Sequence, residues 1–220
     1  MQKSNPFRLR VSGPNACFTR PEMKVERVSY EVMTPSSARG ILEAILWKPA
    51  IRWRILQIDV LNPVKWESVR RNEVGCVVPA GSVKSAMNKG TGDLGFYVEE
   101  ERQQRAGLFL RNVAYVIHAD FEMTEKAGSE DNVVKFEQMF IRRASIGQCF
   151  HRPYFGCREF PVDFEFIAKD AGPIVPLQES RDLGWMLFDM DRTGDEAMPQ
   201  FFHASMTNGV IDLRNVEVRS

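Results

Sequence analysis

Two kinds of hydrophobic periodicity run along the chain and divide it into strands and helices. Strict alternation over residues 7–12 puts Phe7, Leu9 and Val11 on one face, which predicts a strand that is buried on one side. The same alternation predicts three further strands, over residues 51–61, 108–123 and 157–168. The chain therefore carries four half-buried strands that can share one sheet.

Helical spacing of apolar residues appears twice between these strands. One helix is predicted over 35–48, with Thr34 as the N-cap, a proline at the first helical position, and Pro49 closing it. A second helix is predicted over 133–146, starting after Asn132 as the N-cap. The order of elements is then βαββαβ.

That order is typical of the α+β, ferredoxin-like arrangement that RNA-recognition (RRM) modules share. Residues 72–106 show no sustained period and are expected to form a long, partly mobile insertion. The rest of 1–172 is interpreted as an RRM-like domain. Residues 173–220 hold short apolar segments separated by the turn residues Thr193-Gly194-Asp195 and Asn208-Gly209, and they are expected to form a small antiparallel β-sheet domain.

Composition excludes a disordered acidic or basic tail, because 44% of residues are hydrophobic and 29 Lys and Arg balance 29 Asp and Glu. The balance is uneven along the chain. Residues 1–54 hold 10 basic and 4 acidic side chains, and 135–158 hold 5 and 1, whereas 159–220 hold 5 and 12. Any RNA partner is therefore expected on the first strand, the flanks of the helices and the loop after the second helix, while the acidic C-terminal region is expected to face protein partners.

No metal or cofactor is expected. The four cysteines have no CxxC spacing and the three histidines are scattered, whereas a zinc site needs four convergent ligands. No apolar run approaches the roughly 20 residues that span a bilayer. With no signal-peptide pattern in residues 1–12, a cytoplasmic protein with reduced thiols and no membrane partner is predicted.

A resemblance that covers nearly the whole chain is carried by Val28-Ser29-Tyr30, Val32–Ser36, Arg39–Ile45, Trp47-Lys48-Pro49, Arg142-Arg143 and Gly147–Phe160. The resemblance is to one family, the CRISPR-associated Cas-five proteins of the Dvulg type, which are RAMP-superfamily subunits of subtype I-C. It implies an RRM-like domain with a small β-rich C-terminal domain, and a protein that cuts CRISPR repeat RNA and stays in the surveillance (Cascade) complex with the guide.

The resemblance also implies a metal-independent reaction, in which a ribose 2′-hydroxyl attacks the adjacent phosphate. That reaction needs a proton acceptor, a proton donor and a cation beside the phosphorane. In the family a tyrosine at the end of the first helix and a lysine-histidine pair in the second supply these groups. Here the positions hold Leu46, Lys135 and Phe136. Only the cation is carried over, so the protein recruits other side chains, cuts slowly by positioning and charge, or does not cut. Without the resemblance, Lys135 reads equally well as a solvated lysine on a helix face.

Three side chains are candidate substitutes for the missing proton-transfer groups. His118 lies two residues from Asp120 on one polar strand face, which also suits a surface pair with no role. His151 lies in the loop after the second helix and is equally well a structural histidine. Tyr30 is a candidate donor, although most tyrosines are buried for packing.

Basic and aromatic residues on the predicted RNA side are the candidates for RNA binding: Arg8, Arg10, Arg39, Lys48, Arg52, Arg54, Arg142, Arg143, Arg152, Tyr154 and Arg158. The first hypothesis is an endoribonuclease that cleaves precursor CRISPR RNA in the repeat hairpin. The second is a non-catalytic subunit that grips the 5′ handle of the guide RNA. The third is affinity for double-stranded DNA through the same basic face.

Overall fold

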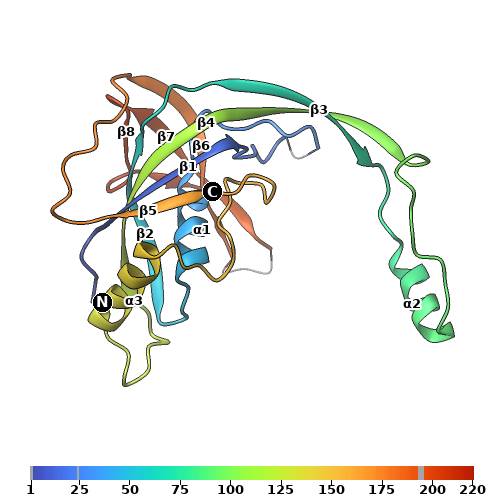
Figure 1. Ribbon diagram of the computed structural model, residues 1–220, viewed down its shortest axis with the longest axis horizontal. Helices are drawn as coiled ribbons and strands as arrows, with labels where there is room; N and C mark the ends of the chain where they lie inside the picture. The colour runs from blue at the N-terminus through green and yellow to red at the C-terminus, as the bar shows by residue number, and fades with distance from the viewer. Residues whose placement is uncertain (1, 24, 193–195) are drawn as a thin grey trace.

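The computed structural model describes residues 2–23, 25–192 and 196–220, and its main body is one antiparallel sheet with two helices against one face (Figure 1). Along the chain this body contains β1 (Phe7–Ala16), α1 (Pro35–Ile45), β2 (Ile51–Val60), β4 (Arg102–Met123), α3 (Val133–Ser145) and β5 (Asp163–Ile167). The strands lie in the order β5, β1, β4, β2, with neighbours antiparallel. The predicted α+β, ferredoxin-like arrangement is confirmed.

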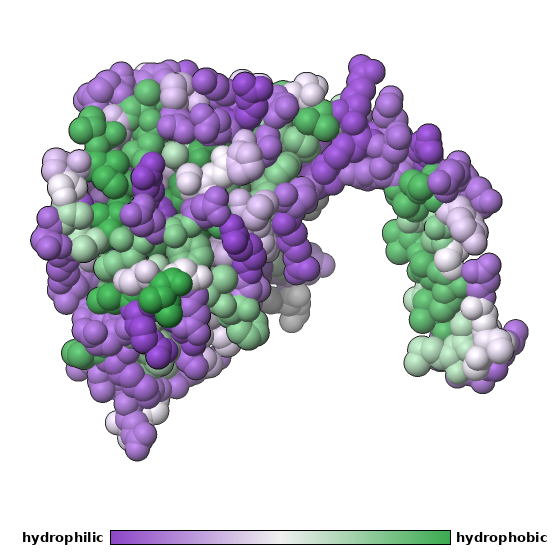
Figure 2. Space-filling model, viewed as in Figure 1, coloured by the Kyte–Doolittle hydropathy of each residue, from purple (hydrophilic) through white to green (hydrophobic). Residues whose placement is uncertain are grey.

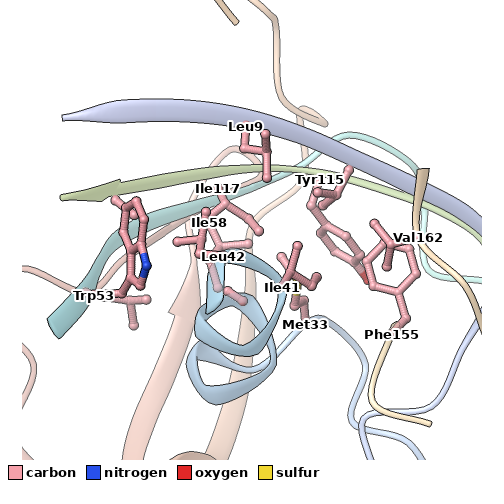
Figure 3. Packing of buried hydrophobic residues seen from close by; sticks show 14 of the residues in the cluster. Leu9, Met33, Ile41, Leu42, Trp53, Ile58, Tyr115, Ile117, Phe155 and Val162 are labelled. Carbon is pink, nitrogen blue, oxygen red and sulfur yellow. The ribbon is translucent and has the colours of Figure 1, made fainter. Parts of the chain in front are cut away.

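The hydrophobic core lies between the sheet and the helices, as the alternation predicts. Leu9 of β1 and Ile117 of β4 point from the sheet toward Leu42 of α1 (Figure 3). Phe140 of α3 packs on Trp53 of β2, with ring centroids 4.7 Å apart. Each such side chain contributes roughly 1.5–3 kcal/mol by leaving water, so this one layer holds the body together.

Both helices begin where their caps predict. The Thr34 hydroxyl accepts a hydrogen bond from the Ser37 amide at 3.3 Å, and Oδ1 of Asn132 accepts one from the Lys135 amide at 2.9 Å. These bonds satisfy N–H groups that have no partner inside the helix. The N-cap of α3 thereby fixes the backbone of Lys135.

Helix α1 ends at Ile45, three residues before the predicted end, because other elements take its last carbonyl groups. The Arg143 guanidinium donates to the Ile45 carbonyl at 2.8 Å, and the Trp53 indole N–H donates to the Leu46 carbonyl at 2.8 Å. The backbone of Leu46 is already extended, with φ −144° and ψ 107°. Residues 46–50 therefore form an irregular segment instead of a last helical turn.

A long hairpin projects from the body. Its regular structure contradicts the irregular insertion predicted over 72–106. β3 (Trp66–Val74) pairs with the first half of β4, and α2 (Ala80–Lys89) lies near its far end (Figure 1). We call residues 66–110 the arm. The sequence pattern missed β3 and α2 because α2 has no buried residue and most of β3 is half-buried or exposed, so neither has a one-sided apolar face. Figure 2 shows apolar side chains gathered along the side of the arm that faces the body. The exposed hydrophobic residues of the arm include Val77, Met87 and Phe96.

The C-terminal region forms a second, three-stranded sheet of β6 (Arg181–Asp191), β7 (Met198–Met206) and β9 (Val218–Arg219). One predicted member of it is elsewhere: β8 (Val210–Asp212) pairs with β2 in the main sheet. The Asn208-Gly209 turn is present, because Thr207 and Val210 exchange two backbone hydrogen bonds of 2.9 and 3.0 Å across it. The turn connects β7 of the second sheet to β8 of the main sheet. The predicted Thr193-Gly194-Asp195 turn lies outside the described residues, and the domain boundary at 172/173 stays a prediction.

Strand β5 is shorter than the predicted 157–168, because the chain turns back on itself first. The Phe155 amide donates to the Phe160 carbonyl at 2.8 Å, and Gly156 has a positive φ of 77°. A Cβ at Gly156 would lie 2.0 Å from the Cys17 carbonyl oxygen, so only glycine fits this close approach. The loop is thus held against the start of the segment after β1. Within the described residues, no helix is both long and apolar enough to cross a membrane.

Candidate active site and nucleic-acid interface

Three lysines meet where the segment after α1, the β4–α3 loop and the first turn of α3 come together. Lys48, Lys126 and Lys135 line one cavity with Pro49, Ala50, Asp131, Phe136 and Met139. A second cavity adjoins it and shares Lys48, Pro49 and Lys126 with the first. We call this pair of cavities the lysine groove.

Lys135 is held at the groove by its neighbour on the preceding turn. Its Nζ lies 2.9 Å from Oδ1 of Asp131, and the lysine side chain is 43% exposed. The hydrogen bond from Lys135, together with the Gly128 amide and the charge of Lys48, lowers the pKa of the Asp131 carboxyl below its ordinary value. Asp131 is therefore a carboxylate at neutral pH, and Lys135 presents a positioned cation to the groove.

Leu46 and Phe136, which occupy the family's tyrosine and histidine positions, are core residues. Leu46 is fully buried. The Phe136 ring is 2% exposed and packs edge-on against Phe121, with centroids 6.4 Å apart. Neither side chain can carry a proton, so the groove has the cation of the family site without its acid and base.

The other lysines of the groove are unpaired. The side chains of Lys48 and Lys126 make no hydrogen bond or ion pair with any residue that the structure describes, although the charge of Lys48 acts on Asp131. The remaining titratable groups that line the groove are Glu43, Arg52 and Glu125. Glu43 is bound by Arg39 at 2.8 Å, so its charge is already compensated.

His151 lies at the opposite end of α3 from Lys135. The amide of its neighbour Phe150 donates to the Ala44 carbonyl near the end of α1 at 2.8 Å. The 13 residues of α3 separate the two ends by roughly 18 Å at 1.5 Å per residue. His151 therefore follows the far end of this helix, and its action beside Lys135 stays a prediction.

The loop around His151 forms a second surface with basic and aromatic side chains. The His151 and Tyr154 rings stack with centroids 6.4 Å apart. Arg142 and Arg158 are exposed and have no polar partner among the described residues. Arg152 differs, because its guanidinium binds the Asp163 carboxylate at 2.5 Å and the Val162 carbonyl at 3.1 Å.

His118 and the predicted arginine row lie on the sheet face away from the helices. Arg54 grips Asp120 with two hydrogen bonds of 2.8 and 2.6 Å, and Arg52 binds Glu122 at 2.5 Å. His118 is 2.7 Å from Asp59. His118 and Asp120 lie on the same strand face, as predicted, and each binds a different partner on β2.

On the same sheet face, Arg8 donates to the carbonyl groups of Ala168 and Ala171 at 2.8 and 3.4 Å. Arg10 lies 3.9 Å from Glu165. The side chains on this face that were predicted to bind RNA are therefore engaged within the protein.

Tyr30, Arg39 and Arg143 have positions inside the protein. Tyr30 is 2% exposed, and burial raises the pKa of its hydroxyl. Arg39 bridges Glu43 and Asp189 at 2.8 and 2.7 Å, and so ties α1 to β6. Arg143 caps α1, as described above. The hydroxyl of Tyr30 is enclosed by protein rather than facing a groove.

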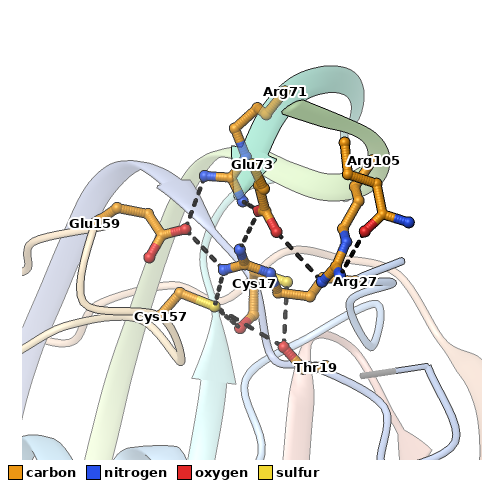
Figure 4. Close-up of polar contacts among 9 residues, drawn as sticks. Cys17, Thr19, Arg27, Arg71, Glu73, Arg105, Cys157 and Glu159 are labelled. Carbon is orange, nitrogen blue, oxygen red and sulfur yellow. Dashed lines mark hydrogen bonds and ion pairs between the residues drawn. The ribbon is translucent and has the colours of Figure 1, made fainter. Parts of the chain in front are cut away.

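A network of arginines and glutamates joins the arm to the body, and the sequence pattern did not indicate it (Figure 4). Arg27 binds Glu73 of β3 at 2.7 Å and Glu159 of the loop before β5 at 2.9 Å. Arg71 of β3 binds the same Glu159 at 2.8 Å, and Arg105 of β4 lies 3.5 Å from Glu73. The network fixes the arm against the loop that carries His151 and Tyr154.

Two cysteines lie under this network. The Cys157 thiol accepts hydrogen bonds from Cys17 and Arg27, and these bonds lower its pKa to about 6, while the pKa of Cys17 is raised. Both are free thiols. No group of three His, Cys, Asp or Glu side chains suited to a metal ion occurs in residues 2–23, 25–192 and 196–220.

Comparison with known families agrees with the resemblance that the sequence blocks carry. Residues 7–214 match the profile of the family described as CRISPR-associated protein (Cas_Cas5). The chain belongs to the CRISPR-associated Cas5 family. The match spans both sheets and the arm, and it agrees with the predicted membership in subtype I-C.

This Cas5 chain is similar to two proteins named CRISPR pre-crRNA endoribonuclease Cas5d. The one from Mannheimia succiniciproducens is 54% identical over an alignment of 215 residues that covers 96% of this chain and 95% of that protein. The one from Thermus thermophilus is 38% identical over an alignment of 225 residues that covers 94% of this chain and 90% of that protein. A solved structure described as "Crystal Structure of CRISPR-associated Protein" superposes with a TM-score of 0.70 at 22% identity, covering 100% of this chain and 99% of that one, and this likeness concerns the fold alone.

The predicted site residues of the Cas5 chain thus fall on separate surfaces. Lys48 and Lys135 line the lysine groove, the loop after α3 carries His151 and Tyr154, and four of the arginines, Arg8, Arg10, Arg52 and Arg54, lie on the far sheet face. Sequence reasoning missed Lys126 as a site residue, because nothing in its own loop shows that Lys48 and Lys135 will fold beside it.

Proposed function

We propose that this Cas5 protein is an endoribonuclease that binds precursor CRISPR RNA, cleaves it in the repeat hairpin, and remains a subunit of the type I-C surveillance (Cascade) complex in the cytoplasm. The observation that carries the proposal is the 54% identity, over almost the full length of both chains, to a protein named CRISPR pre-crRNA endoribonuclease Cas5d. The lysine groove is the site where we propose that the RNA is cut.

The proposed chemistry is attack of a ribose 2′-hydroxyl on the adjacent phosphate, leaving a 2′,3′-cyclic phosphate. Negative charge develops on the phosphorane oxygens, and a fixed cation beside them lowers the barrier. The ion pair of Lys135 with Asp131 supports this role for Lys135, because it holds the ammonium group at the groove.

Proton transfer is the weak part of the site, because Leu46 and Phe136 are buried and apolar. The carboxylates at the groove that no arginine binds are Asp131 and Glu125, and water is the other acceptor. A carboxylate with a lowered pKa is a poor general base. We therefore expect slow cleavage in which positioning and charge do most of the work.

Arg142, His151, Tyr154 and Arg158 are proposed to hold the RNA away from the cut. They lie in the last turns of α3 and in the loop after it, and this separation from Lys135 suits contacts with a second part of one folded RNA. The apolar side of the arm supports a role in contacts with other subunits of the complex (Figure 2).

The alternative is a Cas5 subunit that grips the 5′ handle of the guide without cutting. The burial of Leu46 and Phe136 favours it, because two of the three family catalytic groups are absent. Affinity for double-stranded DNA is a third candidate. A binding titration against salt would test it, since phosphate contacts give a steep dependence of affinity on salt.

The deciding experiment is cleavage of the protein's own repeat RNA in the presence of a chelator. We expect a product that ends in a cyclic phosphate, no cut when the scissile ribose is 2′-deoxy, and a rate at least about 100-fold lower for Lys135→Ala. Arg142→Ala is the matched control on the same helix and should keep the cleavage rate once RNA is saturating. Tight binding without any cut would favour the handle-binding alternative, and a wild-type rate for Lys135→Ala would remove the lysine groove as the active site.

A further inference from the structure

Trp47 faces solvent at the end of α1, beside the lysine groove. Its side chain is 61% exposed, while Trp53, six residues later, is 3% exposed and packed in the core. The contrast follows from the end of α1. The extended backbone of Leu46 turns the leucine side chain inward, and the next side chain then points outward.

The exposed indole forms one wall of the second cavity of the lysine groove. The other apolar walls are Pro49, Ile51 and Met123, and the cavity volume is about 600 Å³. Pockets that enclose small ligands have volumes of roughly 300–1,000 Å³ and mostly apolar linings. This cavity is therefore wide enough for a flat aromatic group to lie on the indole.

The charges around this cavity favour an anionic ligand. Glu43 is bound by Arg39, and Arg52 is bound by Glu122, so these side chains are compensated. The uncompensated groups in the described part of the cavity are Glu125 and the two lysines, Lys48 and Lys126. A flat apolar wall beside unpaired cations suits a nucleotide, which joins an aromatic base to a phosphate.

The same two lysines also line the cavity that holds Lys135. The wall of Trp47 and the ammonium group of Lys135 therefore belong to one continuous groove. A nucleotide next to the phosphate at Lys135 would contact the indole if the RNA runs along the groove past Lys48 and Lys126.

We propose that Trp47 stacks on the nucleobase next to the scissile phosphate, and that Lys48 and Lys126 bind the phosphates of that nucleotide. The inference deepens the proposed function, since it names the subsite that positions the RNA. Trp47 is a positioning residue and touches no reacting atom. Base stacking on an aromatic side chain is sequence-tolerant, so the subsite selects an unpaired nucleotide rather than a particular base.

A binding titration separates this subsite from cleavage. The full-length protein is titrated with its repeat RNA made uncleavable by a 2′-deoxy ribose at the scissile position. We expect Trp47→Ala to weaken binding about 10-fold or more, and Trp47→Phe to keep most of the affinity. Trp66→Ala is the matched control, because Trp66 is also exposed but lies on the arm.

Salt dependence distinguishes stacking from charge. For single strands, the slope of log affinity against log salt changes by about 0.7 for each phosphate that the protein no longer neutralises. Lys126→Ala should reduce the slope by about that amount, and Trp47→Ala should lower the affinity with the slope unchanged. A role of Trp47 in folding alone would not produce this split, and the unfolding temperature of both variants should match the wild type.

Fluorescence reports the stacking directly. In a Trp66→Phe, Trp185→Phe background the remaining tryptophans are Trp47 and Trp53, and Trp53 is buried. The uncleavable RNA should quench the emission of this background, and the further change Trp47→Phe should abolish the quenching.

The outcomes are distinct for the two proposals. RNA that binds and quenches Trp47 but is never cut leaves the subsite intact and rejects the nuclease. Binding that is unchanged in both Trp47→Ala and Lys126→Ala overturns the subsite, whatever the cleavage result. A weaker affinity of Lys126→Ala together with a wild-type affinity of Trp47→Ala rejects the stacking role.

Discussion

Two basic regions of this Cas5 protein look alike in the sequence and differ in the structure. On the outer face of the sheet, Arg52 and Arg54 bind Glu122 and Asp120 on the neighbouring strand. In the lysine groove, Lys48 and Lys126 have no partner within the described residues, and Lys135 has a single exposed ion pair. The arginines are used by the fold, whereas the lysines remain available to a ligand.

The difference follows from geometry as well as from residue type. Arg54 and Asp120 lie directly opposite each other in antiparallel register, where a planar guanidinium can meet both carboxylate oxygens. The lysines come from three separate segments, and the groove holds only two acids that no arginine binds, Asp131 and Glu125. Charge that is compensated across a sheet contributes stability, and charge that converges without compensation contributes binding.

The largest expected difference between the outer sheet face and the lysine groove is the effect of a mutation on protein stability. Arg54→Ala leaves the Asp120 carboxylate, whose side chain is 8% exposed, without its cation, and should lower the free energy of unfolding by about 2 to 4 kcal/mol. Lys126→Ala in the groove should change it by less than about 0.5 kcal/mol. Urea denaturation of both variants measures the contrast.

The double variant Arg54→Ala, Asp120→Ala is the control, since it removes the charge together with its partner. It should recover part of the stability that the single change loses. Equal stabilities of Arg54→Ala and the wild type would mean that the arginines on the outer sheet face are free to bind a ligand. The contrast between these arginines and the groove lysines would then be wrong.

An element of the fold could be predicted from the sequence where the pattern that specifies it lies within the element itself. Alternation correctly assigned Leu9 and Ile117 to the core face, and the caps Thr34 and Asn132 correctly started both helices. The arm was missed because α2 buries no side chain and so leaves no periodicity to read.

The candidate site was harder to predict because partners come from distant segments. The excess of basic residues in 1–54 is real, but Arg52 and Arg54 are neutralised by acids some 66 to 70 positions later, at Asp120 and Glu122. A count of charges in each sequence segment cannot detect ion pairs between distant segments. For the same reason the sequence does not show that Lys48, Lys126 and Lys135 converge, since the fold alone brings them together.

A smaller effect is expected on RNA affinity, and here the order of the two regions reverses. Lys48→Ala removes an unpaired cation and should weaken binding of the uncleavable repeat RNA several-fold at low salt, with a shallower salt dependence. Arg52→Ala removes a cation whose charge Glu122 already balances, and should leave affinity nearly unchanged. Filter binding at several salt concentrations compares the two, and a greater decrease in affinity for Arg52→Ala would mean that the RNA takes Arg52 from Glu122.

The smallest effect concerns Asp131, the acid of the groove that binds Lys135. Asp131→Asn removes the charge that competes with RNA phosphate for Lys135, so the affinity should rise a few-fold, whereas the acids of the outer row should show no such gain. Because the folded protein lowers the pKa of Asp131 from its ordinary 3.8, its pairing supports stability above that pH and is lost only as pH falls through the lower value. Between pH 5 and 8 the ratio of wild-type to Asp131→Asn affinity should therefore be constant, as measured by binding titrations across that range. A ratio that drifts with pH in this window would mean that another titrating group faces Lys135 when RNA is bound, and the groove would then hold a proton-transfer group as well as its cations.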